Sequence, residues 1–135
     1  MQIGFKQVCV NPEQPVEAAG FMQQVNVKIT EVHDDLYARI LGIKDEAKTL
    51  FLVSLDNLGT PCALEEELTD QYCKETGSQA TIQISCTHDH FAGSAEDKTY
   101  YAQLKRQILA GCKELVFQTC DLRLSRQHVY FDEVG

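Results

Sequence analysis

The stretch Thr81-Ile-Gln-Ile-Ser-Cys-Thr-His-Asp-His90 joins a short strand pattern to a cluster of chemically active residues. Polar and apolar residues alternate up to Cys86, which is typical of a strand, and the pattern breaks at Gly93. Because alternate residues of a strand share a face, we expect Cys86, His88 and His90 to point the same way. Two imidazoles at this spacing can share a metal ion, or one can bind metal while the other moves a proton. Solvated turn histidines are the simpler interpretation, and the motif alone leaves both open.

Two further strands are predicted before this stretch. The run from His33 to Ile43 is a polar turn followed by a strand. Residues 49–55 are so nearly all apolar that we predict a strand buried on both faces, and the short connection between the two favours an antiparallel pair. Weaker strand signals lie at 2–10, where we expect an edge strand, at 25–29, and at about 120–131, where we expect a final strand.

Two helices are predicted from residues at helical spacing. Thr60 is expected to cap the first helix, Gly77 lies where that helix should stop, and Leu64, Leu68 and Tyr72 form its apolar face. The second and longer helix is expected from about 97 to 117. This order predicts one α/β domain over 1–135, a mixed β-sheet with a parallel β-α-β crossover and helices packed on the sheet.

The strand order gathers several polar residues at one edge of the predicted sheet. Asp56 ends one strand and His88 ends the next, and the carboxyl ends of parallel strands meet at the same edge. His33 joins this edge if its strand runs antiparallel to them. Arg39, inside that strand, is expected to form a salt bridge or, near a cleft, to bind a substrate anion.

The composition excludes several classes of function. A net charge of −8 argues against nucleic acid or an anionic membrane surface as the main partner. No apolar run is long enough for a transmembrane segment. The six cysteines show no Cys-x-x-Cys pair, so we expect reduced thiols in a cytoplasmic protein.

Four segments in order resemble the N-terminal domain of the neutral/alkaline non-lysosomal ceramidases. In that family they read roughly as a segment ending in Ala-Gly-Tyr, a His-Asp-Pro-Leu-Tyr-Ala-Arg segment, a strand ending in Asp, and Ser-Ala-Thr-His-Thr-His-Ser-Gly-Pro. The resemblance covers about residues 5 to 95. The matching segments here are 8–21, 33–39, 52–56 and 85–90.

The family's members are zinc-dependent amidases that cleave the N-acyl bond of ceramide. The resemblance therefore implies a zinc cofactor and a small-molecule or lipid-like substrate with an amide or related bond. It makes His88 a zinc ligand, places His90 beside the reaction centre and puts Asp56 near both. We accordingly expect His88, His90 and Asp56 as metal ligands, His90 and Asp56 as catalytic residues, and Arg39 and His33 as substrate-binding residues.

The chain also departs from the family pattern. Asp89 replaces a threonine, and the family's other zinc ligands, a histidine, a glutamate and a tyrosine, have no counterpart in this sequence. Catalytic zinc normally has three protein ligands, so a third would come from Asp56, Asp89, Cys86, His33 or another subunit. Three functions stay open: a compact metal-dependent hydrolase, a non-catalytic binding module that can form a homo-oligomer, and a site completed by another chain.

Overall fold

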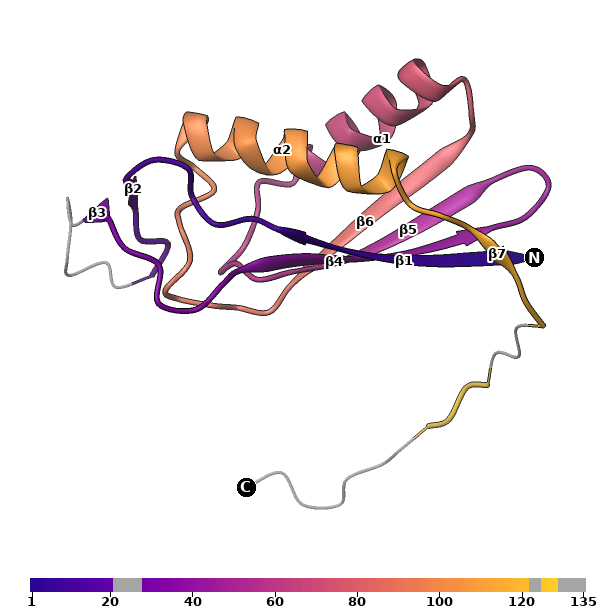
Figure 1. Ribbon diagram of the computed structural model, residues 1–135, viewed down its shortest axis with the longest axis horizontal. Helices are drawn as coiled ribbons and strands as arrows, with labels where there is room; N and C mark the ends of the chain where they lie inside the picture. The colour runs from indigo at the N-terminus through magenta and orange to yellow at the C-terminus, as the bar shows by residue number, and fades with distance from the viewer. Residues whose placement is uncertain (21–27, 122–124, 129–135) are drawn as a thin grey trace.

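In the computed structural model, which describes residues 1–20, 28–121 and 125–128, five strands form one sheet and two helices lie on one face of it (Figure 1). The strands are β1 (Gln2–Cys9), β2 (Val16–Glu17), β3 (Lys28–Ile29), β4 (Tyr37–Lys44), β5 (Thr49–Leu55), β6 (Ala80–Cys86) and β7 (Gln118–Thr119). The helices are α1 (Ala63–Thr76) and α2 (Lys98–Lys113). The large sheet has the order β6-β5-β4-β1-β7, and β2 and β3 pair separately.

The sheet is mixed, as the sequence predicts. β4 runs antiparallel to β5, to which it is joined by a turn where Asp45 accepts hydrogen bonds from the amides of Ala47 and Lys48. β5 and β6 are parallel, and α1 connects them. The predicted α/β fold with a parallel β-α-β crossover is therefore confirmed.

The ends of α1 agree only in part with prediction. Gly77 ends the helix in the left-handed region at φ 69°, as expected for a glycine stop. The prediction that Thr60 caps the start was wrong. The N-cap is Cys62, which makes no side-chain capping bond, and the carbonyl of Pro61 accepts a bond from the amide of Leu64, so a turn separates Thr60 from the helix.

α2 is shorter than predicted because the chain after it packs differently. Asp97 caps its start by accepting hydrogen bonds from the amides of Thr99 and Tyr100. The helix ends at Lys113, and Leu115 and Phe117 pack on the sheet, where glycines leave room. A Cβ atom on Gly42 would lie 2.9 Å from the ring of Phe117, so this close approach needs glycine.

The weaker strand predictions were partly wrong. β1 is not simply an edge strand, because β7 pairs with its first two residues, Gln2 and Ile3. The predicted final strand is wrong for residues 120–121 and 125–128, which are not in a strand, and its other residues lie outside the described ones. Of the strand expected at 25–29, the last two residues form β3, and 25–27 lie outside the described residues. The histidine motif also lies beyond the strand, since β6 ends at Cys86.

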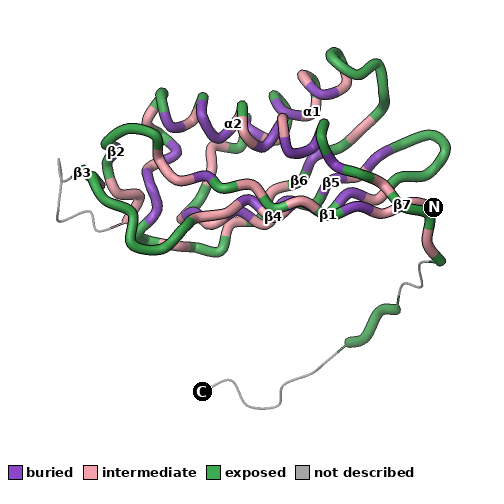
Figure 2. The backbone as a smooth tube through the Cα atoms, in the orientation of Figure 1, coloured by how far each residue is buried: buried purple, intermediate pink, exposed green. Residues whose placement is uncertain are grey.

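The core lies between the helices and one face of the sheet (Figure 2). On β5, Phe51, Val53 and Leu55 face the helices and are almost completely buried. Leu52 points to the other face and is 38% exposed. The prediction that β5 is buried on both faces was therefore wrong, because both helices pack on the same side of the sheet.

The outer edge of β6 is covered by side chains of α1. The hydroxyl of Thr69 accepts a hydrogen bond from the amide of Ile82, and the carboxylate of Glu65 accepts one from the amide of Ile84. These backbone donors, which a neighbouring strand would otherwise satisfy, are therefore paired within the chain.

Candidate functional site

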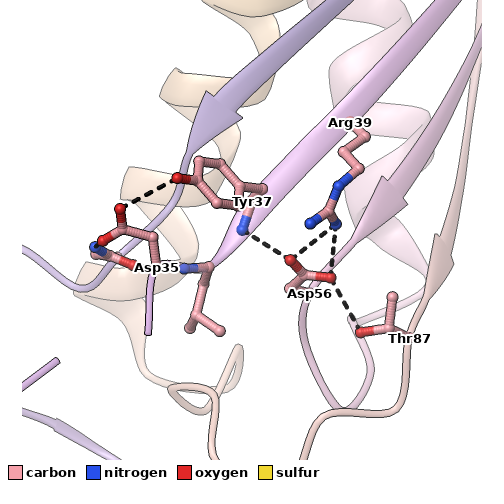
Figure 3. A network of polar contacts seen from close by, with 7 residues as sticks. Asp35, Tyr37, Arg39, Asp56 and Thr87 are labelled. Atoms are coloured by element: carbon pink, nitrogen blue, oxygen red, sulfur yellow. Dashed lines mark hydrogen bonds and ion pairs between the residues drawn. The ribbon is translucent and has the colours of Figure 1, made fainter. Parts of the chain in front are cut away.

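Asp56 is the centre of a polar network at the rim where β5 and β6 end (Figure 3). Its carboxylate accepts two bonds of 2.9 Å from one guanidinium nitrogen of Arg39 and one of 3.0 Å from the backbone amide of Tyr37. The hydroxyl of Thr87 donates a fourth bond of 3.3 Å. Two predicted site residues thus lie together, but Asp56 is held in an ion pair with Arg39.

Asn57 ties the next loop to this rim. It is completely buried, and its amide donates a 3.0 Å hydrogen bond to the carbonyl of Gly93. The backbone carbonyl of Asn57 accepts a hydrogen bond from the backbone amide of Asp89. A buried polar side chain of this kind fixes the loop that carries the histidines, because leaving it unpaired is costly. The sequence interpretation missed Asn57, although its place directly after a buried strand and Asp56 could have indicated it.

His88 and His90 lie in this loop and contact one another. Their ring centroids are 5.0 Å apart, with an edge-on angle of 77° between the planes. The expectation that they share a strand face was wrong, because His88 has φ 65°, which breaks the strand geometry. A left-handed conformation is uncommon for a residue other than glycine, and such outliers cluster at functional sites.

A second segment supports the histidine loop from the side. The amide of Gly20 donates a 3.1 Å bond to the carbonyl of His90, and Ala18 forms a strand-like bridge with Gly93. A Cβ atom on Gly20 would lie 2.7 Å from the Cβ of His90, so only glycine fits here. All four segments that carry the family resemblance therefore meet at this rim.

A cavity of about 460 Å³ adjoins the histidine loop. His33 and Asp89 both line it, so one predicted substrate-binding residue lies near the loop. Arg39 lines a different hollow on the sheet surface. The apolar part of the cavity wall is Pro12, Ile29, Val32, Leu36 and Phe91, and its charged part is Glu31, His33, Asp34 and Asp89.

The charged residues of this cavity are partly paired. The carboxylate of Asp34 lies 2.9 Å from Nδ1 of His33, and this hydrogen bond raises the pKa of the imidazole above its ordinary value. Asp89 accepts a 2.8 Å bond from the amide of Phe91 through one carboxylate oxygen. The margin of the cavity is therefore acidic and able to form hydrogen bonds, while its wall is apolar.

The described residues do not fit a complete zinc site. In the described ranges, no three His, Cys, Asp or Glu side chains lie close enough together to hold a metal ion. Asp56 is engaged with Arg39, and His33 with Asp34. Burial raises the pKa of the Cys86 thiol, which disfavours the thiolate form that binds metal. His88 and His90 are thus two candidate ligands without a third beside them.

The fold and the rim define a mixed α/β domain whose polar loops follow two parallel strands. No family model and no curated protein matches this chain. Solved structures that share its fold include two ceramidases. Neutral ceramidase from Pseudomonas aeruginosa matches with a TM-score of 0.71 and 12% identity, over 83% of this chain and 21% of that one.

A ceramidase complexed with C2 matches with a TM-score of 0.63 and 14% identity, over 82% of this chain and 20% of that one. The chain therefore has a ceramidase-like fold, and the resemblance predicted from sequence is confirmed at the level of fold. It spans about a fifth of the length of the ceramidase chains that it matches. No helix in the described part of the chain is long and apolar enough to cross a membrane.

Proposed function

We propose that this chain is a ceramidase-like domain that supplies His88 and His90 to a zinc centre completed by another polypeptide. One observation carries this proposal. The loop after β6 holds the two imidazoles in edge contact at 5.0 Å, and the described residues place no third ligand group with them. Imidazole is a common zinc ligand, and a zinc site needs more than two protein ligands, so a partner would have to supply the rest.

The neighbouring cavity supports an apolar substrate for the completed centre. Val32, Leu36 and Phe91 give it an apolar wall, while His33 and Asp89 offer hydrogen-bonding groups at its margin. Both matched structures are ceramidases. Hydrolysis of an amide or related bond in a lipid-like molecule is therefore the activity that we propose.

Asp56 and Arg39 have a positioning role in this proposal. The carboxylate of Asp56 bridges Tyr37 and Arg39 on β4 to Thr87, the residue before His88. To bind a metal ion, Asp56 would have to give up its pairing with Arg39, which would leave a half-exposed guanidinium without its partner. We therefore infer that this pair holds the rim in shape and that the two histidines contact the metal.

Zinc titration by calorimetry on untagged protein tests the proposal. Wild type should bind one zinc ion weakly, and His88→Ala and His90→Ala should each lose most of that binding. His33→Ala is the matched control. It removes an imidazole that is bonded to Asp34 and should leave zinc binding unchanged.

Cobalt(II) in place of zinc separates a half-site from a complete one. A half-site keeps several water ligands and should give only the weak visible absorption of octahedral cobalt. Intense tetrahedral absorption would show that this chain completes the site alone, against the proposal. Zinc binding that is absent, or equal in wild type and His88→Ala, would also overturn it.

The second candidate is a non-catalytic binding or oligomerisation module that shares the ceramidase fold. It is favoured by apolar side chains on the uncovered sheet face, including Phe5, which is 63% exposed. Absence of zinc binding in a folded protein would favour this candidate. All six cysteines are free thiols, which supports a reducing compartment, and we propose the cytoplasm as the location in either case.

A further inference from the structure

The face of the sheet opposite the helices carries two continuous rows of apolar side chains. The strand register sets them side by side, since directly paired residues of neighbouring strands point to the same face. One row is Phe5, Leu41 and Leu52, and the other is Ile3, Ile43 and Leu50. We call these six residues the open apolar face.

One row of the open apolar face is exposed to solvent in the single chain, and the other row, Ile3, Ile43 and Leu50, is partly buried. Phe5 is 63% exposed, Leu41 36% and Leu52 38%, whereas Ile40 and Phe51, their neighbours in sequence, are completely buried under the helices. No described helix packs on this face (Figure 1). A shallow hollow of about 580 Å³ lies over it, lined by Phe5, Leu41 and Leu52 and bordered by polar residues and by the charged side chains of Arg39 and Glu65. Contiguous exposed patches of this kind mark interaction sites.

The charge of this face indicates which partner it suits. Among the described strand residues that point to this side, Arg39 is the only one with a charge, and Asp56 neutralises it. The whole chain carries a net charge of −8, so copies of it repel one another over most of their surface. A basic partner or a membrane would be recognised through charge. An uncharged apolar face instead matches another uncharged apolar face, and a second copy supplies one.

We propose that two copies of this chain associate through their open apolar faces, sheet against sheet, about a two-fold axis. Stacked sheets pack about 10 Å apart through side chains of this type, and the same patch on both copies makes a closed dimer. The whole sheet face of β1, β4, β5 and β6, four strands about 4.8 Å apart and about seven residues long, spans roughly 19 Å by 23 Å, and the open apolar face lies on the first three of these strands. This is at the small end of specific interfaces, so we expect a dissociation constant on the order of 10 µM. None of the zinc-binding candidates takes part, so this inference stands apart from the proposed zinc centre. It makes the second candidate function specific by naming the face and its partner.

Analytical ultracentrifugation from about 1 to about 200 µM tests the proposal, because mass action makes a weak dimer depend on concentration. Wild type should shift from monomer to dimer over this range. Leu52→Lys places a charge at the β5 end of the row formed by Phe5, Leu41 and Leu52, and should weaken association at least tenfold. Val116→Lys is the matched control, since Val116 is 74% exposed but follows α2, away from the open face, and should associate as wild type.

Three results would overturn the proposal. Wild type could stay monomeric at every concentration, Leu52→Lys could dimerise as tightly as wild type, or Val116→Lys could disrupt the dimer as strongly as Leu52→Lys. Circular dichroism melting shows whether each variant is folded. If Leu52→Lys does not fold, Leu41→Gln changes the neighbouring residue of the same row with less disturbance and should also weaken association.

Discussion

The two faces of β5 have similar residues and opposite environments. Phe51, Val53 and Leu55 are covered by the helices, whereas Leu52, between two of them, is 38% exposed. The difference shows the limit of an apolar strand pattern. The pattern predicts that both faces of the strand are covered, but it does not show which helix, strand or partner covers each face. Here the helices bury one side, and we propose that a second copy of the chain buries the other.

Phe51→Ala changes the covered face of β5 and should have the largest effect on stability of the substitutions considered. The ring is completely buried and packs edge-on against Tyr72, with centroids 5.0 Å apart. Removing it leaves a cavity, so we expect the free energy of unfolding to fall by about 3–5 kcal/mol. Urea denaturation followed by circular dichroism measures this. A loss below about 1 kcal/mol would mean that this side of β5 is less tightly packed than the structure shows.

Asn57→Ala tests a third environment, a buried polar side chain at the rim where β5 and β6 end. It leaves the carbonyl of Gly93 without its side-chain donor, so we expect a loss of about 2 kcal/mol. Hydrogen exchange should also speed up in residues 87–94, which Asn57 holds. Gln71→Ala, which removes an exposed bond to Glu75 on α1, is the control and should change neither quantity. Unchanged exchange in the histidine loop would count against a positioning role for Asn57.

Tyr100→Phe tests the covered face through its response to pH. The hydroxyl of Tyr100 donates a 2.9 Å bond to the carbonyl of Val10, and burial raises its pKa from 10.0 to about 12. In the unfolded chain the Tyr100 phenol loses its proton from about pH 10, whereas in the folded chain it stays protonated up to about pH 12. The free energy of unfolding therefore falls as the pH rises from 10 to 12.

At pH 7, where the phenol is neutral in both states, we expect Tyr100→Phe to cost about 1 kcal/mol for the lost hydrogen bond. Above pH 10, its stability should fall less steeply than that of wild type. Some alkaline loss should remain in both proteins, because burial also raises the pKa of the Cys112 thiol to about 12. Denaturation series at several pH values measure the two slopes. Equal slopes would show that Tyr100 does not titrate as proposed.

Leu52→Ala should have the smallest effect on folding. At about 1 µM protein, below the expected range of the dimer, we predict a change within about 0.5 kcal/mol, as for other exposed positions. The same denaturation assay used for Phe51→Ala gives a direct comparison of the two faces. A loss near that of Phe51→Ala would show that this face is already covered within the monomer.

The sequence predicted the elements best where local pattern and tertiary packing agree. The strand at 49–55 and the stop at Gly77 follow from local signals, and the shared edge of Asp56 and His88 follows from one crossover. Pattern alone could not show that α2 ends at Lys113, because Leu115 keeps the helical spacing although it and Phe117 pack on the sheet. Tertiary space near Gly42 decides that boundary.

The candidate site was less predictable, because its contacts join residues far apart in sequence. Arg39 was expected to form a salt bridge, but nothing in its local pattern identified Asp56 as the partner. The contact between Gly20 and His90 joins residues that only the fold brings together. The residue type of His88 likewise does not predict its positive φ. The alternating strand pattern that ends at Cys86 was therefore wrongly continued to His88 and His90.

The side chains of Thr69 and Glu65 that cover the edge of β6 have a consequence for aggregation. An exposed edge strand is a template on which further chains can add, and such growth has no natural end. Here the amides of Ile82 and Ile84 are already bonded to α1, so another strand could not add at this edge without displacing those bonds. The bonds to α1 therefore disfavour fibre growth by strand addition at the β6 edge, although one face of the sheet is apolar and uncovered by helices.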